Sequence, residues 1–292
     1  NKRKLSKFPS LRLALIGYDT LFPQALAVAC RMKKITLVAI QERTIQPALN
    51  FRYLLDKYFI IGSQSKKILE KRIDKKMELI EMGAVKMKQH FEEGKEVKIL
   101  NGNNYKLKCL VMDWGSSRDW YVNGRFYNTN WKKNLNFYQT ILHLAENNKD
   151  VLFLIKSKNY LWLEIDFFKK LVSDLKKIEN VEILSDQMKW TPSNCIKSTD
   201  FGIALMTSLA DEMLIFDKPV IIFESDDFPS FILDYGPDII SKNFEDLSTK
   251  VQKIKSDLKF YNDKLNSVRV KFYKQFSIEK FSAELNKLSL NL

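Results

Sequence analysis

The chain has 292 residues, of which 45% are hydrophobic and 28% are charged, a composition typical of a globular protein long enough for two domains. Its formal net charge is +13, but the lysines are scattered among acidic residues, which argues against dedicated nucleic-acid binding and favours a loose attraction to an anionic membrane surface. No apolar run approaches the roughly 18 residues that a membrane span needs.

The first third of the chain predicts alternating strands and helices. Apolar, β-branched runs predict three strands, at 11–16, 35–40 and 57–61. Amphipathic patterns predict two helices, at 22–33 and 64–82. Because these units are few for an α/β domain and the first methionine is Met32, we expect the chain to begin inside a longer protein.

The rest of the chain predicts a nearly regular series of strand–helix units. Further strands are expected at 106–112, 151–156, 181–184, 201–206 and 219–224. Helices are expected at 131–148, 164–178 and 208–217, with one or two amphipathic helices after residue 243. Several strands are continuous apolar runs, as expected when both faces of a parallel sheet are covered. The predicted fold class is therefore α/β, with parallel sheets and right-handed crossovers.

A segment rich in Gly, Ser, Asn and aromatic residues, DWGSSRDWYVNGRFYNTN at 113–130, predicts a junction between domains. We therefore expect a first domain at 1–120, a second domain at 121–275 and a C-terminal helix at 276–292. The first of these has fewer strand–helix units than the second and is incomplete by this interpretation.

Cysteine and histidine are sparse. Cys30, Cys109 and Cys195 are far apart and form no CxxC pair, which argues against zinc sites and disulfides and favours a reducing cytoplasm. His90 and His143 are the only histidines, and ordinary surface or packed positions are the simpler interpretation for both. We expect neither a metal ion nor a cofactor.

The segment TSLADEML, at 207–214, stands where an expected strand ends and a helix begins. If Ser208 is the N-cap, Asp211 completes a capping box, which explains both residues without a ligand. Glu212 shares a helix face with Ser208 and is expected to point along the strand ends. A helix N-terminus attracts phosphate, and a carboxylate one turn later can accept hydrogen bonds from a ribose. Thr207, Ser208, Asp211 and Glu212 are therefore candidates for binding a nucleoside diphosphate.

Three other residues are candidates for the same site. Lys156 and Lys158 follow the apolar run VLFLI and can supply positive charge for phosphates, and solvated surface lysines are an equal alternative. Trp190 lies in another strand-end loop, where its ring can cover a base, and ordinary packing is the alternative.

The order VLFLIKSK, VEILSDQMKWTPSN and STDFGIALMTSLADEMLIFDKPVIIFE resembles the C-terminal half of GT-B-fold glycosyltransferases, over roughly residues 125–275. In that family, a loop with a basic residue precedes a loop that cups the base. A strand then leads to a small-residue turn and a helix carrying an acid for the ribose. The N-terminal part, IGYDTLFPQALAVACRMKKITLVAIQER, is similar to the acceptor half of bacterial surface-polysaccharide transferases. The resemblance implies two Rossmann-like domains facing a cleft, with C-terminal helices packing back.

The resemblance also implies a metal-independent reaction, in which Lys156, Lys158 and the amides at 207–208 stabilise the leaving diphosphate. The chain has no Asp-x-Asp metal motif, and TS replaces the glycine-rich turn of the family. If the reaction inverts the anomeric carbon, a group must take the proton of the acceptor. Asp19 and Glu42 are candidates because each follows an expected strand, and turn or capping roles are the alternative.

Three functions are compatible with these features. The first is a cytoplasmic glycosyltransferase, at the inner face of the membrane, that moves a sugar from a nucleotide sugar to a surface polysaccharide or a lipid-linked acceptor. The second keeps the fold and changes the reaction, as in polyol-phosphate transferases or nucleotide-sugar epimerases, of which an epimerase needs no acceptor surface. The third is a non-catalytic module that binds a nucleotide sugar.

Overall fold

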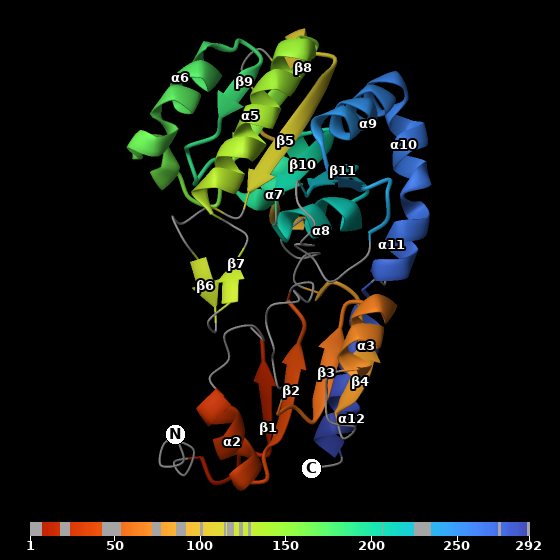
Figure 1. Cartoon of the computed structure of the whole chain (residues 1–292). Helices are drawn as coiled ribbons and strands as arrows, with labels where there is room; N and C mark the ends of the chain where they lie inside the picture. The colour runs from red at the N-terminus through yellow and green to blue at the C-terminus, as the bar shows by residue number, and fades with distance from the viewer. Residues whose placement is uncertain are drawn as a thin grey trace. The chain divides into compact units, whose positions relative to one another are not determined.

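The computed structural model describes residues 8–17, 24–42, 54–71, 77–85, 92–99, 102–113, 115, 120–122, 125–127, 130–205, 207–224, 235–273 and 276–290. The chain divides into two units (Figure 1). Unit 1 consists of Asn1–Ile45, Leu49–Gln89 and Ser267–Leu292, and unit 2 consists of Gln46–Ala48 and His90–Asn266. Each unit is built around its own parallel sheet, which confirms the predicted α/β class with two Rossmann-like parts.

Unit 1 contains a four-stranded parallel sheet in the order β1-β2-β3-β4. Its strands are β1 (Leu13–Ile16), β2 (Thr36–Ile40), β3 (Lys57–Ile60) and β4 (Glu78–Glu81). Helix α2 (Gln24–Met32) connects β1 to β2, and helix α3 (Ser63–Glu70) lies between β3 and β4 in the chain. The central strands β2 and β3 are buried except at their first residues, as their continuous apolar sequences predict.

The predicted helix at 64–82 is wrong beyond Glu70, where α3 ends. The sequence ELIE forms the edge strand β4 and pairs in parallel with β3, Leu79 lying opposite Tyr58. An edge strand of this kind is less buried than its neighbours, so its sequence lacks the continuous apolar run that marks the other strands.

The C-terminal helix α12 (Ile278–Leu290) packs on the sheet of unit 1. Leu288 is buried in one cluster with Val38 and Phe59. The ring of Phe281 meets that of Phe59 edge-on, with 5.3 Å between the ring centroids. The chain therefore returns to unit 1 after it has completed unit 2, as predicted for C-terminal helices that pack back.

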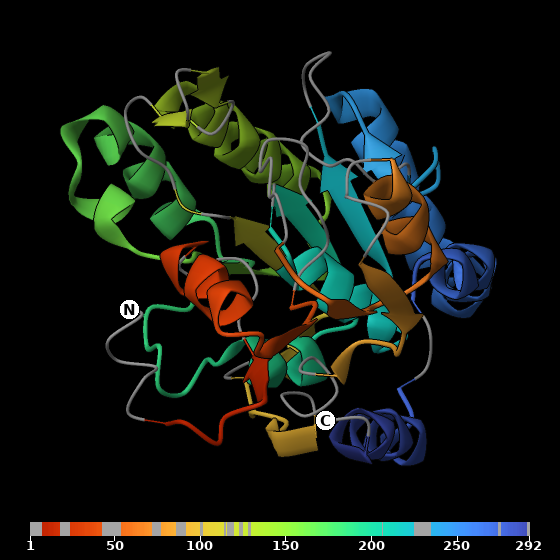
Figure 2. The same cartoon turned by 90° about the horizontal axis from the view of Figure 1, so that it is seen from below.

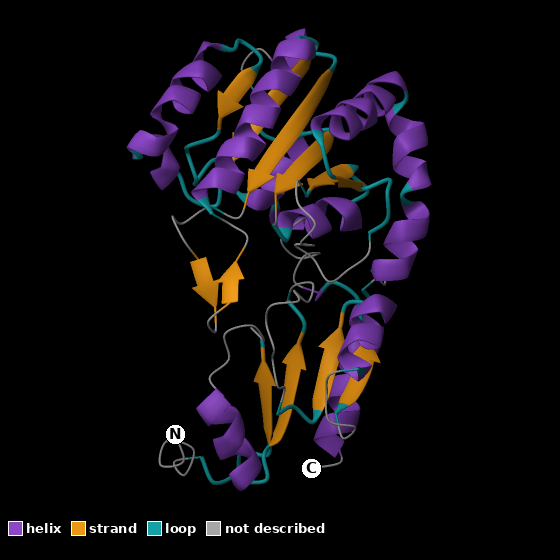
Figure 3. Ribbon diagram, viewed as in Figure 1, coloured by secondary structure: helices purple, strands orange, loops and turns teal. Residues whose placement is uncertain are grey.

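Unit 2 contains a six-stranded parallel sheet in the order β12-β11-β10-β5-β8-β9. Its strands are β5 (Leu107–Asp113), β8 (Val151–Lys156), β9 (Val181–Ile183), β10 (Phe201–Leu205), β11 (Val220–Phe223) and β12 (Ile240–Ser241). Helices alternate with these strands along the chain (Figure 3). They are α5 (Trp131–Asn147), α6 (Lys169–Lys177), α7 (Pro192–Ser198), α8 (Leu209–Ile215), α9 (Phe244–Ser256) and α10 (Leu258–Lys264). The next helix, α11 (Asn266–Phe272), belongs to unit 1 from Ser267 onward.

The division between the units lies near residue 90, whereas the sequence suggested a boundary at 120. The reason is strand β5, which is buried along most of its length and pairs with both β8 and β10 at the centre of the second sheet. The polar segment after it holds a separate antiparallel pair, β6 (Trp120–Val122) and β7 (Arg125–Tyr127), and belongs to unit 2. Gly, Ser and Asn here mark a connection within a unit.

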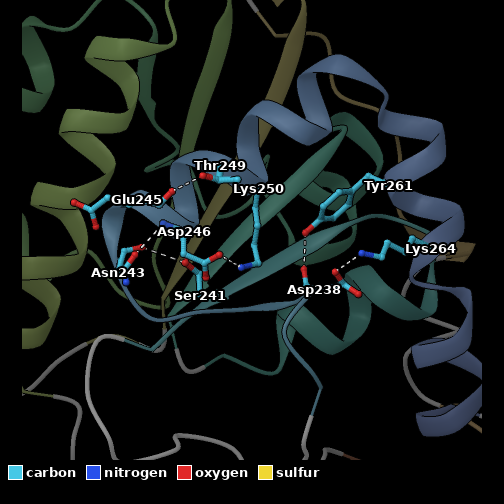
Figure 4. Close-up of polar contacts among 9 residues, drawn as sticks. All are labelled: Asp238, Ser241, Asn243, Glu245, Asp246, Thr249, Lys250, Tyr261 and Lys264. Carbon is cyan, nitrogen blue, oxygen red and sulfur yellow. Dashed lines mark hydrogen bonds and ion pairs between the residues drawn. The ribbon is translucent and has the colours of Figure 1, made fainter.

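The last part of unit 2 covers the β12 edge of its sheet. Helix α9 packs beside β11 and β12 (Figure 2). The side chain of Asn243 caps α9 by accepting a hydrogen bond of 2.8 Å from the amide of Asp246. Tyr261 donates to the carbonyl of Asp238, whose carboxylate pairs with Lys264 at 2.6 Å (Figure 4). These contacts fasten α9 and α10 to the segment that forms β12.

Candidate functional site

The order of the strands in unit 2 creates a topological switch point. From the central strand β5, the chain builds β8 and β9 on one side and then returns to build β10, β11 and β12 on the other. Open parallel sheets bind ligands beyond the carboxyl ends of their strands at such a point. Asp113 and Leu205, which lie opposite each other at the ends of β5 and β10, therefore flank the expected ligand position.

The segment after β10 carries two of the predicted hydroxyl groups. Thr207 is buried, and its Oγ1 accepts a hydrogen bond of 3.3 Å from the amide of Leu209 at the start of α8. Ser208 is the N-cap by position, but its backbone is already helical and its side chain makes no capping hydrogen bond. The predicted capping box of Ser208 and Asp211 is therefore wrong, because Thr207 provides the side-chain acceptor instead.

The two acidic candidates on α8 differ in environment. Asp211 is only 1% exposed, and its carboxylate accepts a hydrogen bond from the hydroxyl of Tyr235. This bond accounts for Asp211 without a ligand. Glu212 is half-buried and lies one turn beyond Ser208. Glu212 is thus the better placed of the two to meet a ribose, and donor binding by either residue stays a prediction.

The two candidate lysines lie at the end of β8, which is paired with β5. The side chain of Lys156 is half-buried, and its Nζ donates to the carbonyl of Ser157 at 3.1 Å and lies 5.5 Å from the ring centroid of Tyr160. Within the described part of the chain, Lys156 forms no ion pair. Lys158 is exposed, and its backbone amide donates to Asp113 at 3.2 Å. Positive charge therefore stands beside the switch point.

Trp190 is 3% exposed and lies in the connection between β9 and α7. Its backbone amide donates to the carbonyl of Asp186, and the Nζ of Lys189 lies 5.0 Å from its ring centroid. This position matches the packing alternative, and stacking on a base requires the ring to move. Its role in base binding stays a prediction.

A buried polar cluster at the switch point has no counterpart among the sequence candidates. The carboxylate of Asp113 accepts hydrogen bonds from the Tyr138 hydroxyl at 2.7 Å and from Asn134 Nδ2 at 3.1 Å. Ser157 Oγ lies 2.8 Å from the Tyr138 hydroxyl and accepts from Trp162 Nε1 at 2.9 Å. We call these five residues the Asp113 cluster. Burial raises the pKa of the Asp113 carboxyl, although its hydrogen bonds from Tyr138 and from the backbone amides of Lys158 and Gly115 act in the opposite direction.

The sequence does contain a signal for this cluster. Asp113 is an acidic residue at the end of the continuous apolar run of β5, and such a strand end is where an open parallel sheet binds its ligand. Gly115 follows two residues later with φ +85°, a conformation that favours glycine. A Cβ atom at Gly115 would lie 2.9 Å from Asn159 Nδ2 and 3.7 Å from the Cβ of Lys158. The loops after β5 and β8 are therefore in direct contact.

We expect Gly115→Ala to destabilise unit 2 more than the matched substitution Gly236→Ala. Both glycines have positive φ, so both changes carry a similar backbone strain of about 1 kcal/mol, but the space around Gly236 is open. Only Gly115→Ala also displaces Asn159. Chemical denaturation followed by tryptophan fluorescence reports on this unit, because all five tryptophans belong to it. Equal losses in the two variants would contradict the close approach of the loops.

In unit 1, the candidate Glu42 is half-buried and lies two residues beyond the end of β2. Its neighbour Gln41 is 2% exposed and ties the end of β2 to the next strand–helix unit. Gln41 Nε2 donates to Ser65 Oγ at 3.1 Å, and Gln41 Oε1 accepts from the amide of Ile61 at 2.8 Å. Asp19 lies outside the described residues. Glu42 thus stands at the carboxyl edge of the unit 1 sheet, and a catalytic role for either acid stays a prediction.

Among the described residues, no histidine or cysteine belongs to the Asp113 cluster. His143 is exposed on the last turns of α5 and lies 3.4 Å from Glu146, while His90 lies outside the described ranges. All three cysteines are buried thiols, and burial raises the pKa of Cys195 to about 12. Within the described ranges, no group of three or more His, Cys, Asp or Glu side chains is arranged to hold a metal ion. Of the helices in those ranges, none is long and apolar enough to cross a membrane.

Comparison with solved structures identifies the fold as the GT-B type. A putative UDP-N-acetylglucosamine 2-epimerase from Listeria monocytogenes matches with a TM-score of 0.68 and 13% identity, over 100% of this chain and 78% of that chain. The S. aureus MnaA–UDP complex matches with a TM-score of 0.68 and 14% identity, over 100% of this chain and 79% of that chain. The wall teichoic acid polymerase TagF matches with a TM-score of 0.56 and 12% identity, over 95% of this chain and 71% of that chain. Neither a family model nor a curated protein sequence matches the chain.

Proposed function

We propose that the chain is a glycosyltransferase that moves a sugar from a nucleotide-sugar donor, without a metal ion, to a surface polysaccharide or a lipid-linked acceptor. The observation that carries this proposal is that the candidate groups gather at the switch point. The strand order of unit 2 directs a ligand to the ends of β5 and β10. The hydroxyls at 207–208 follow β10, and Lys156 and Lys158 lie at the end of β8, which pairs with β5. The net charge of +13 supports a working position at the cytoplasmic face of an anionic membrane.

In this proposal, Lys156 and Lys158 neutralise the diphosphate of the donor. A half-buried ammonium group is costly unless an anion faces it, and the partners of Lys156 are a carbonyl and an aromatic ring. A diphosphate supplies the negative charge. Because that charge grows on the leaving group during transfer, the lysines stabilise the transition state more than the ground state.

The remaining residues that bind the nucleotide-sugar donor lie on α8 and on the segments next to it. Glu212 accepts hydrogen bonds from the ribose hydroxyls, and Ser208 contacts the phosphates with its hydroxyl, which capping does not use. Thr207 and Asp211 hold the turn, through the amide of Leu209 and the hydroxyl of Tyr235, respectively. Trp190 covers the base after a change of its side-chain conformation.

The acceptor proton is assigned to Glu42 or Asp19 of unit 1. Glu42 is the better supported of the two, because Gln41 fixes the backbone next to it through two buried hydrogen bonds. A general base must be held in place if it is to take a proton from an acceptor hydroxyl. The same hydrogen bonds are compatible with Glu42 being only a turn residue. Activity measurements therefore distinguish the general base from the turn residue.

Thermal unfolding with UDP, GDP, ADP, TDP, CDP and CMP tests donor binding. A ligand at 100 times its dissociation constant adds about 2.7 kcal/mol to the free energy of unfolding, which raises the midpoint by a few degrees. We expect one nucleotide to raise the midpoint, EDTA to leave this shift intact and Glu212→Ala to abolish it. Glu245→Ala, at the start of α9, is the control and should keep the shift. A shift that EDTA removes would contradict metal independence, and no shift with any nucleotide would contradict the donor site.

Epimerisation of a nucleotide sugar is the second candidate, because two of the matching structures are named as UDP-N-acetylglucosamine 2-epimerase or contain UDP. Transfer of a polyol phosphate is a third, on the likeness to TagF. Proton NMR of the chain with a nucleotide sugar alone separates the first two reactions. A new sugar isomer without an acceptor means epimerisation, while release of nucleoside diphosphate that depends on an added acceptor means transfer. Donor binding with no turnover under either condition favours a non-catalytic module.

A further inference from the structure

The carboxylate of Asp113 is saturated with hydrogen bonds. Oδ2 accepts from Tyr138 and from Asn134, and Oδ1 accepts from the backbone amides of Gly115 at 3.1 Å and Lys158 at 3.2 Å. A carboxylate offers about four acceptor positions, so these four donors occupy its capacity. Asp113 is 3% exposed. It therefore has no acceptor position left for a ligand, although it lies at the switch point.

The hydrogen bonds of the cluster can run in one direction, from Trp162 to Asp113. The indole of Trp162 can only donate, so Ser157 Oγ accepts its hydrogen. Ser157 can then donate its own hydrogen to the Tyr138 hydroxyl, which in turn donates to Asp113. The stacked rings of Tyr138 and Trp162, with 4.5 Å between centroids, hold this relay in place. Side chains from α5, from the loop after β8 and from η2 (Leu161–Glu164) therefore all support one carboxylate.

The other two bonds of Asp113 reach the backbone of two neighbouring loops. Its Oδ1 holds the amide of Gly115 in the loop after β5 and the amide of Lys158 in the loop after β8. The two loops also touch directly, because Gly115 lies against Asn159 and Lys158. One oxygen atom thus fixes the separation of two loops that flank the expected diphosphate position.

We propose that Asp113 is a positioning residue of the donor site, which sets the place of Lys158 and of the β5 loop without contacting the nucleotide sugar itself. This proposal rests on the donor site given under Proposed function and adds a residue to it. Misplacement of a charged group by about 1 Å is enough to cost up to a hundredfold in activity. The saturated carboxylate opposes such movement, because a shift of the Lys158 backbone breaks its part-buried hydrogen bond to Asp113.

Substitutions of Asp113 separate positioning from other roles. Asp113→Ala removes both oxygens, so we expect faster exchange of the amide hydrogens of Gly115 and Lys158 and at least about tenfold weaker binding of the nucleotide identified in the panel. Asp113→Asn keeps one oxygen for the two amides, and Asn134 can turn its amide group to match the new side chain. Affinity within about threefold of the wild type is therefore expected for Asp113→Asn. A tenfold loss in Asp113→Asn with both amides still protected would overturn positioning, because the charge itself would then be required.

Asn180→Ala is the matched control for lost stability. Asn180 is 1% exposed and donates to the carbonyls of Ala145, Asn148 and Val151, close to the amino ends of β8 and β9. Its loss removes a buried polar network from the same sheet at the opposite edge. We expect Asn180→Ala to lower the unfolding midpoint and to leave nucleotide affinity within about twofold. Equal losses of affinity in Asn180→Ala and Asp113→Ala would overturn the proposal, because general destabilisation would explain both.

A double-mutant cycle with Lys158→Ala tests whether Asp113 affects nucleotide affinity through Lys158. If Asp113 acts through Lys158, Asp113→Ala should reduce affinity markedly less in the Lys158→Ala background than in the wild type. Fully additive losses would overturn this route. Failure of the donor site itself has a different signature, in which the wild type binds no nucleotide of the panel while the two amides remain protected by Asp113. Unprotected amides in the wild type would overturn the positioning role alone.

Discussion

Leu288→Ala is expected to lower the free energy of unfolding of unit 1 by about 2–5 kcal/mol, the range for truncation of a buried leucine. Leu288 is 5% exposed and packs in one cluster with Val38 of β2 and Phe59 of β3. Since its helix comes more than 200 residues after these strands in the chain, the substitution tests whether the C-terminus completes the first unit. Native-state hydrogen exchange of the β2 and β3 amides measures the loss, with the β8 and β10 amides as the internal reference.

Ile278→Ala is the control for this prediction. Ile278 lies on the same helix but is 57% exposed, so its truncation should change the stability of unit 1 by no more than about 0.5 kcal/mol. Similar effects of the two substitutions, or no effect of Leu288→Ala, would show that α12 does not contribute to the core of unit 1.

Glu42→Gln is expected to reduce the turnover number by about 10²–10⁴-fold, the usual contribution of a general base. The amide keeps the size of the side chain and loses the ability to take a proton from the acceptor. Donor affinity should be unchanged, because the proposed donor groups all belong to unit 2. Steady-state rates of nucleoside diphosphate release, combined with titration of the nucleotide, measure the two effects separately.

The matched control for Glu42→Gln is Glu70→Gln, an exposed glutamate at the end of α3. It should retain the wild-type turnover number. If Glu42→Gln also retains it, the acid is a turn residue, and Asp19 becomes the remaining candidate for the base.

Most of unit 2 could be predicted from the sequence because its strands are buried on both faces. Continuous apolar runs such as VLFLIK and FGIAL have few alternatives to a central parallel strand, and they form β8 and β10. The edge strand β4 was not predicted, because ELIE is short, carries a charged residue at each end and follows directly on a helical pattern. The division near residue 90 differs from the expected boundary at 120 for a related reason. In the sequence, β5 and the polar segment after it resemble the end of a domain, and only the pairing of β5 with β8 and β10 places β5 in unit 2.

The candidate site was predictable in position and less so in detail. Strand-end residues such as Thr207 and Lys156 can be found in the sequence, because an acid, hydroxyl or lysine after an apolar run is conspicuous. Hydrogen bonds between segments that are distant along the chain cannot be found in this way. The bond between Tyr235 and Asp211 spans 24 residues, and that between Lys158 and Asp113 spans 45. The burial of Asp211 and the cluster around Asp113 depend on such contacts.

A crystal structure with the nucleotide that stabilises the chain tests the central claim most directly. We expect the diphosphate beyond the carboxyl ends of β5 and β10, within hydrogen-bond reach of Lys156 or Lys158, and the ribose hydroxyls on Glu212. We also expect Asp113 to keep its bonds to Gly115 and Lys158 and not to touch the ligand. A nucleotide bound at the amino edge of this sheet, or only to unit 1, would contradict the donor site.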